Sequence, residues 1–137
     1  SSTANIVGNL DSGETVLPAA GFNLNDPASY HSATSMSVYD SLGNPHTMAL
    51  YFMKTAANTW SVFGANDGTQ IGAGALGTLA FSPNGSIDPA TSTFPRNVSI
   101  TSATGSYTPF NVMVDFAGST QYGSAFGITE LRQNGFA

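Results

Sequence analysis

Glycine and proline residues, some of the glycines in Asn-Gly pairs, interrupt this chain at short intervals. This spacing limits what the chain can fold into. The 137 residues include 15 glycines and 7 prolines, and the apolar stretches between them are short. Ordinary helices need longer uninterrupted runs of about 8–20 residues, whereas strands do not. The spacing therefore predicts short strands joined by many turns.

Two neighbouring stretches alternate between apolar and polar residues, as half-buried strands do. In residues 34–40, Met36 and Val38 lie on one side of the expected strand. Residues 47–53 repeat this pattern with three apolar side chains on one face. The segment 40–46 between them combines Asp, Gly, Asn and Pro, which is a strong turn signal. The pair is predicted to form a β-hairpin.

Residues 46–63 lack glycine and proline, so a helix is an alternative there. Met48 and Leu50 are good helix formers, but Tyr51, Phe52 and the threonines that follow favour strands. Two strands separated by a short loop at 56–58 fit the pattern better. Further strands are expected at residues 5–10, 60–63, 78–81, 98–100 and 112–116, and in the last segment, 120–137.

This series of strands predicts an all-β fold, either an antiparallel β-sandwich or a flattened β-barrel, in a single domain with an extended N-terminal arm. The arm is assigned to residues 1–33, because Pro18, Gly21 and Pro27 prevent a long regular element there. The β-rich domain is assigned to residues 34–137.

Charge and composition exclude several classes of function. Only 8% of the residues are charged, and 17 Ser, 15 Thr and 11 Asn supply most of the polarity instead. The net charge is −5 with three widely separated basic residues, so a nucleic-acid surface is not expected. There are no cysteines, which excludes disulfides and thiolate metal sites. No apolar run is long enough to cross a membrane as a helix, and no cleaved signal peptide is expected.

Several short motifs suggest a catalytic or binding site, but the residues around them do not fit such a site. Residues 72–77 match the dinucleotide-binding pattern G-x-G-x-x-G, but a turn precedes them and a strand follows, so they predict a loop. His31 and His46 are the only histidines, and His46 is expected to be exposed in a turn without a special role. No catalytic residue, cofactor site or metal site is predicted; a weak calcium contact in a loop stays open.

Large aromatic residues leave a second type of function open. Trp60, Tyr51 and Phe52 could line a sugar-binding face, although at strand spacing such side chains are more often part of a core. Asn84 and Asn97 begin matches to the N-glycosylation pattern, which are expected by chance in a chain so rich in Asn and Ser.

Three stretches together resemble the bacterial flagellar hook protein family, and their order and spacing agree over residues 34–137. The first contains V-Y-D-S-L-G-N-P-H at 38–46, followed by L-Y-F at 50–52, K-T at 54–55 and Trp60. The second is L-A-F-S-P-N-G at 79–85. The third is D-F-A-G-S-T-Q-Y-G-S at 115–124, closed by Q-N-G-F at 133–136. The first motif is specific, whereas the second alone would carry no weight.

The resemblance implies a structural role and not an enzymatic one. Hook proteins form a curved tubular polymer, a universal joint that transmits torque from the flagellar motor to the filament. The implied partners are other copies of the same subunit in a helical tubular assembly, and the implied location is the extracellular hook, reached by flagellar export without a cleaved signal. The chain looks like the outer β-rich domain, whose contacts with neighbours would support curvature, and as an isolated fragment it is expected to be monomeric.

The motif residues are expected to determine the fold. Asp40, Gly43, Asn44 and Pro45 would set the hairpin turn. The other expected fold determinants, which lie further along the chain, are Trp60, Gly85, Gly118, Gln121 and Gly123. Two alternatives remain for the function: the related distal rod protein, or a secreted β-sandwich that binds a ligand such as a sugar. A secreted module would bind a small molecule as a monomer, whereas a hook domain would gain affinity only within the polymer.

Overall fold

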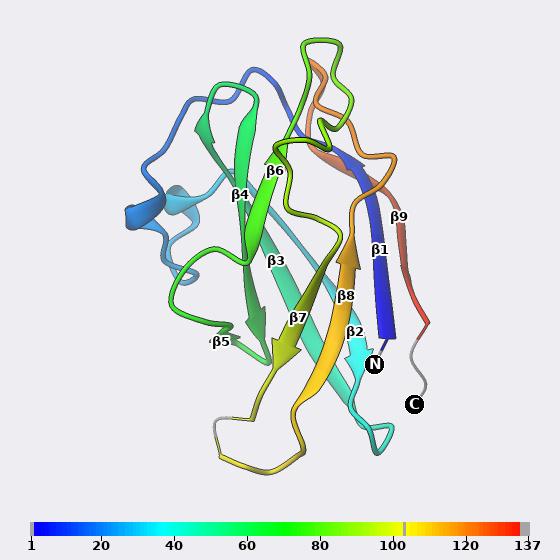
Figure 1. Cartoon of the computed structure of the whole chain (residues 1–137). Helices are drawn as coiled ribbons and strands as arrows, with labels where there is room; N and C mark the ends of the chain where they lie inside the picture. Colours follow the sequence, from blue (N-terminus) through cyan, green and yellow to red (C-terminus); the bar gives the residue numbers. More distant parts are fainter. Residues whose placement is uncertain (1, 103, 135–137) are drawn as a thin grey trace.

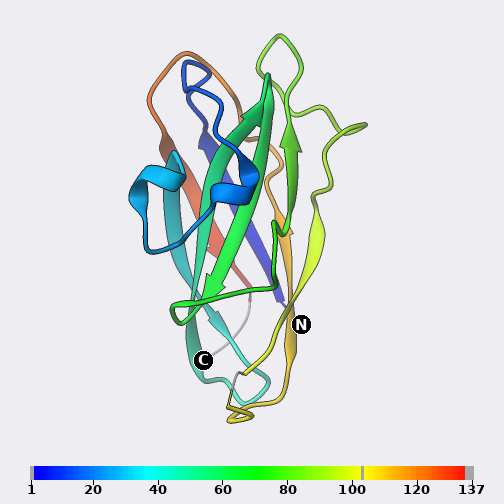
Figure 2. The same cartoon turned by 90° about the vertical axis from the view of Figure 1, so that its left-hand side faces the viewer.

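The computed structural model, which describes residues 2–102 and 104–134, consists of two β-sheets packed face to face (Figures 1 and 2). One sheet has the order β7-β8-β1-β9; the other has the order β2-β3-β4-β5, with β6 also paired to β4. The strands are β1 (Ser2–Asn9), β2 (Ser32–Tyr39), β3 (Pro45–Ala56), β4 (Thr59–Asn66), β5 (Thr69–Gln70), β6 (Gly77–Ala80), β7 (Arg96–Ile100), β8 (Phe110–Asp115) and β9 (Gly127–Gln133). The predicted all-β sandwich is confirmed, and the two sheets as described do not close into a barrel.

The hairpins predicted from alternation are present. Strands β2 and β3 pair antiparallel with Met36 opposite Met48, and β3 pairs antiparallel with β4. The segment that could have formed a helix is therefore two strands. The turn from β4 to β5 has positive φ at both central residues, Asp67 (49°) and Gly68 (85°), as a type I′ hairpin turn requires.

The first strand corrects two sequence-based expectations. β1 lies between β8 and β9, and it pairs parallel with β8 and antiparallel with β9, so the sandwich is not wholly antiparallel. Ala4 and Ile6 are fully buried in the core. Residues 2–9 are thus built into a sheet, and only the later part of the 1–33 segment runs over the outside.

That later part covers the outer face of the second sheet. It contains two short 3-10 turns, η1 (Ala19–Gly21) and η2 (Pro27–Ser29), and Figure 2 shows it passing in front of the strands. Phe22 stacks on Phe63 of β4 with ring centroids 4.0 Å apart, and Tyr30 contacts Tyr51 of β3 edge-on at 4.9 Å. The segment forms a small aromatic layer outside the main core.

The main core lies between the two sheets and is apolar. Its largest fully buried side chains include Trp60, Phe52, Phe116 and Ile6. They come from β4, β3, the residue directly after β8, and β1, so both sheets contribute. Among the described residues, no helix has the length and apolar character needed to cross a membrane.

Candidate functional site

Asp40 organises the turn between β2 and β3, at the lower end of the sandwich in Figure 1. Its Oδ1 accepts hydrogen bonds from the backbone N–H groups of Leu42 (2.9 Å) and Asn44 (3.0 Å). Gly43 has φ of 82°, and its N–H donates to the Asp40 carbonyl. These bonds close the turn, and Pro45 begins β3 directly after it.

The second carboxylate oxygen of Asp40 binds a histidine, which corrects the expectation for His46. His46 Nε2 lies 2.8 Å from Asp40 Oδ2, and Nδ1 lies 2.7 Å from Asp67 Oδ2. Only 10% of the His46 side chain is exposed. Its ring also packs on the ring of Tyr107, with centroids 4.3 Å apart. His46 is thus a mostly covered link between two turns, not an exposed turn residue.

The link changes the pKa of all three groups. Burial by itself lowers the pKa of His46, but hydrogen bonds to Asp40 and Asp67, and their negative charges, outweigh it and raise that pKa above its ordinary value. The His46 hydrogen bond is the main cause that lowers the pKa of Asp40. At Asp67, burial by itself raises the pKa. The hydrogen bonds from His46 and from the Thr47 N–H outweigh burial, so the pKa of Asp67 is lowered as well. The arrangement favours an imidazolium between two carboxylates.

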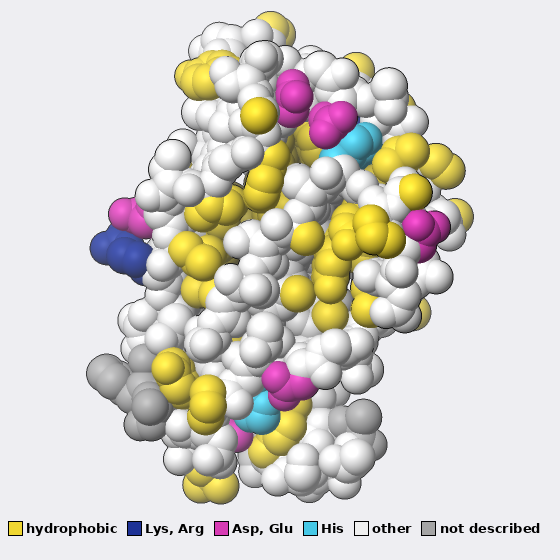
Figure 3. Space-filling model, turned by 180° about the vertical axis from the view of Figure 1, so that it is seen from behind, with side chains coloured by type: hydrophobic (Ala, Val, Ile, Leu, Met, Phe, Trp, Pro, Cys, Tyr) yellow, Lys and Arg dark blue, Asp and Glu magenta, His cyan; other side chains and the backbone are white. Residues whose placement is uncertain are grey.

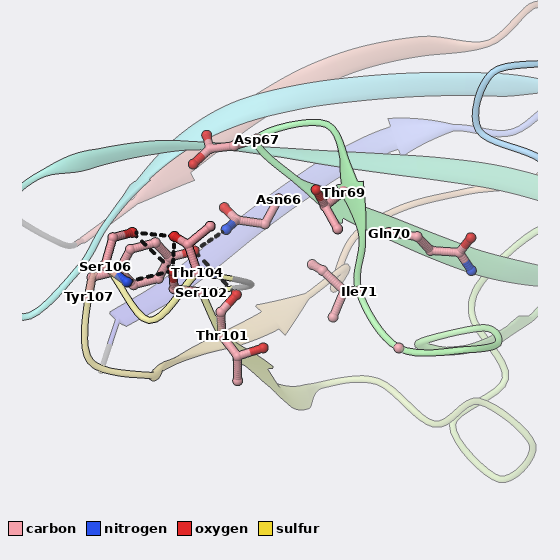
Figure 4. Close-up of a pocket in the computed structure, with 11 residues that line it drawn as sticks. Asn66, Asp67, Thr69, Gln70, Ile71, Thr101, Ser102, Thr104, Ser106 and Tyr107 are labelled. Atoms are coloured by element: carbon pink, nitrogen blue, oxygen red, sulfur yellow. Dashed lines mark hydrogen bonds between the residues drawn. The ribbon is translucent and has the colours of Figure 1, made fainter.

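A polar pocket of about 270 Å³ adjoins this cluster (Figure 4). It lies between the β4–β5 turn and the loop that joins β7 to β8. Asn66 Nδ2 donates to Tyr107 Oη at 2.6 Å, and hydroxyl groups of the β7–β8 loop bond to one another beside it. Asp67 is the charged residue of the lining, and His46 already holds its carboxylate. This lining offers neutral hydrogen-bonding groups and no paired acid and base.

The second group of expected fold determinants lies at the other end of the sandwich. Trp60 is 1% exposed, so it belongs to the core and not to a sugar-binding face. Its Nε1 donates to Gln121 Oε1 at 2.7 Å, and Gln121 Nε2 donates to Asn58 Oδ1 at 3.0 Å. Gln121 thereby joins the segment after β8 to the turn between β3 and β4.

The glycines at this end differ in what they require. Gly85 and Gly118 have φ of 89° and 90°, and a side chain at Gly85 would also collide with the ring of Tyr122. Gly123 is not in the positive-φ region, and an added Cβ would meet Ser12 Oγ at an ordinary 3.6 Å. The geometry therefore requires glycine at 85 and 118 but not at 123.

The surface offers little charge with which to build a metal or anion site. Within residues 2–102 and 104–134, no group of three or more His, Asp or Glu side chains is arranged to hold a metal ion. Residues 72–76 form a loop that is exposed at 72–75 and leads directly into β6 at Gly77, so the segment is not a strand-to-helix phosphate loop. Figure 3 shows a face of mostly neutral polar atoms with scattered apolar and charged side chains.

The expected fold determinants thus lie at two opposite ends of the sandwich. The structure also brings together three residues that the sequence did not identify as a group. His46 and Asp67 meet because β3 and β4 pair with Met48 opposite Asn66, which brings Asp67 beside the start of β3. Tyr107 reaches His46 from the β7–β8 loop of the other sheet. The turn that precedes residues 72–77 was expected from the sequence, but the strand register that places its Asp67 carboxylate against His46 was not.

Comparisons with known proteins agree on one family. Residues 9–136 match the family model described as the flagellar basal body protein FlaE D2 domain. The chain is 31% identical over 137 residues to the flagellar hook protein FlgE of Escherichia coli (strain K12), covering 98% of this chain and 33% of the relative. It is 33% identical over 140 residues to the same-named protein of Salmonella typhimurium strain LT2, again covering 98% and 33%. The chain thus spans about a third of the length of these relatives.

A solved structure has a similar fold. The 32 kDa fragment of the flagellar hook protein FlgE from Caulobacter crescentus superposes with a TM-score of 0.59 at 19% identity, covering 77% of this chain and 46% of that one. At 19% identity this similarity shows a shared fold and nothing further. The family model, by contrast, matches nearly the whole sequence, and the chain belongs to the family of FlaE D2 domains of flagellar basal body proteins.

Proposed function

We propose that this chain is the outer β-rich domain of a flagellar hook subunit, and that it works as a structural module. The observation that carries the proposal is the match of 98% of the chain to relatives named flagellar hook protein. The distal rod protein and the secreted sugar-binding module are not favoured, because the relatives named above are flagellar hook proteins and Trp60 is enclosed in the core.

In this proposal the domain acts as a rigid body between neighbours in a helical tube. The low charge supports that role, because only 8% of the residues are charged. Few ion pairs could therefore form between neighbouring domains and lock them in one relative position. Contacts between single domains would be small and polar, below about 1,200 Å². The polymer would hold because every subunit makes many such contacts at once. No catalytic step is part of this role.

The location follows from the same proposal. The subunit would reach the outside of the cell through the flagellar export channel, without a cleaved signal, and remain in the hook. A chain with no cysteines suits that route, because no disulfide could form before or during passage of an unfolded chain.

Immunogold electron microscopy on intact flagella tests the proposal. Antibody raised against the 137-residue chain should place gold on the short curved segment between cell and filament. Antibody that has first been incubated with the free chain should give no label, which controls for specificity. Gold on the filament, or on the cell surface away from flagella, would contradict the proposed role.

A further inference from the structure

The two ring nitrogens of His46 face two carboxylates from different turns. The distances are 2.7 Å to Asp67 and 2.8 Å to Asp40, both within the range of a charge-assisted hydrogen bond. A neutral imidazole has one N–H donor, whereas an imidazolium has two. While both carboxylates are ionised, both contacts can be hydrogen bonds only when His46 carries its second proton.

The ring of His46 also reaches the other sheet. It packs on Tyr107 of the β7–β8 loop at 4.3 Å and on Phe110 of β8 at 5.6 Å. The titratable groups that face it are thus Asp40 from the β2–β3 turn, Asp67 from the β4–β5 turn and Tyr107 from the opposite sheet. One protonated side chain therefore connects three segments at this end of the sandwich.

We propose that His46, Asp40 and Asp67 form a pH-sensitive clamp, which holds the two turns together while the imidazole is protonated and releases one of them when it is not. The geometry does not depend on the proposed hook role, because the three residues belong to one chain. If the clamp test fails, the immunogold result still stands; if the immunogold test fails, the clamp result still stands.

The two carboxylates differ in how firmly they are held, which indicates the turn that is released. The Asp40 side chain is 2% exposed, and its other oxygen accepts two backbone N–H groups. The Asp67 side chain is 49% exposed, so water can replace the imidazole there. When His46 loses its proton, the remaining N–H stays with Asp40 and Asp67 turns away.

Release of Asp67 has a local consequence. Its Oδ1 accepts the backbone N–H of Thr47 at 2.8 Å, and Asp67 also lines the polar pocket. Loss of the His46 contact would weaken that bond and loosen the β4–β5 turn at the rim of the pocket. The β2–β3 turn would keep its bonds from Leu42 and Asn44 to Asp40.

The direction of the pH effect follows from the pKa shifts. The pKa of His46 is raised on folding, so its stabilising contribution is complete below the unfolded value of 6.5 and is lost as the pH rises through the folded value. The carboxylate pKa values are lowered, so their contribution is present above about 4 and is lost as the pH falls further. The clamp is strongest between these limits.

The test combines a histidine titration with thermal unfolding of the 137-residue chain. By NMR, both ring nitrogens of His46 should be protonated at pH 6, with a midpoint above that of free histidine. The Tm should fall by about 2–5 °C between pH 6 and pH 8.5. His46→Gln should remove most of that fall. A midpoint at or below that of free histidine, or a Tm fall of equal size in His46→Gln, would overturn the clamp.

Asp67→Asn gives a second test that is safe for folding, since this side chain is half exposed. It should lower the His46 midpoint and reduce the fall in Tm. Asp26→Asn is the matched control: it removes the same charge from an exposed 3-10 turn and should change neither.

Amide hydrogen exchange then identifies the turn that opens. Protection at Thr47 should drop about tenfold or more across the His46 midpoint, while protection at Leu42 and Asn44 should be retained. Equal loss at all three amides, or no loss at Thr47, would contradict release of Asp67.

Discussion

Gly43 occupies a position in the β2–β3 turn that only glycine adopts easily. Its φ of 82° lies in the region where a Cβ crowds the neighbouring carbonyl oxygen. The bonds from Leu42 and Asn44 to Asp40 hold the turn in this shape, so the backbone cannot relax without losing them.

Gly43→Val should therefore lower the free energy of unfolding by at least about 1–2 kcal/mol. Urea denaturation followed by tryptophan fluorescence measures this. Gly123→Ala is the control, because Gly123 lies outside the positive-φ region and has room for a methyl group; it should change stability little. An unchanged midpoint in Gly43→Val would show that the turn tolerates another shape.

Gln121 is the only side chain that the structure, as described, pairs with the buried indole N–H of Trp60. Gln121→Met keeps the length of the side chain but leaves this N–H without an acceptor. The expected loss is about 1–3 kcal/mol, the typical penalty for a buried unsatisfied donor.

Chemical denaturation of Gln121→Met measures that loss, with Ser124→Ala as the control from the same loop. Ser124 is exposed and contributes its backbone carbonyl to Asn9, which the substitution preserves. Equal stability of the two variants would mean that the Trp60 bond does not contribute to the fold.

At the scale of elements, the segment 11–31 behaves as a cover and not as a free arm. Phe22 is its main contact, stacked on Phe63 and tilted against Tyr51. The backbone is bonded at Ser12 to Tyr122, at Leu17 to Lys54 and at His31 to Phe52, and Lys54 Nζ donates to the carbonyls of Ser12 and Glu14. The middle of the segment therefore depends on aromatic packing.

Phe22→Ala should lower stability by about 1–2 kcal/mol, less than for a core phenylalanine because Phe22 is only half buried. It should also make the segment the first site of limited proteolysis, while the sandwich stays folded. Val16→Ala, at a side chain that is 55% exposed, should leave the digestion pattern unchanged. Cleavage that starts elsewhere in Phe22→Ala would contradict the cover.

The sequence predicted elements well where the signal is local. The β2–β3 hairpin could be recognised because alternation and an Asp-Gly-Asn-Pro turn lie within about twenty residues. A strand was expected only from residue 5, because two of the three buried residues of β1 are Ser2 and Ala4, which do not mark a strand. Its parallel pairing with β8, more than a hundred residues away, leaves no periodicity in the sequence.

In the candidate site, too, local interactions can be predicted from the sequence and long-range ones cannot. The role of Asp40 is an interaction with its own turn, which the residue types of that turn indicate. The His46–Asp67 contact spans 21 positions, and the Trp60–Gln121 bond spans 61. Both depend on strand register and sheet packing, which residue types alone do not determine.

At the scale of the whole molecule, the surface indicates how strongly one copy attracts another. The large hydrophobic side chains exposed in the described part of the chain are Val16, Leu42, Tyr122 and Leu131. They lie in four different segments, and single exposed apolar residues are normal on monomers. A stable pair of globular domains usually buries about 1,200–2,000 Å² with an apolar centre, which such isolated side chains do not provide.

The isolated chain should therefore be a monomer up to about 100 μM, since a single small polar contact corresponds to a weaker dissociation constant than that. Sedimentation velocity over a concentration series measures this, and the sedimentation coefficient should stay constant. Attaching the chain to a trimeric coiled coil supplies several contacts at once, and association between trimers should then appear at lower concentration. A dimer of the free chain at micromolar concentration would instead mean that one strong interface exists, and assembly would not need the combined effect of many weak contacts.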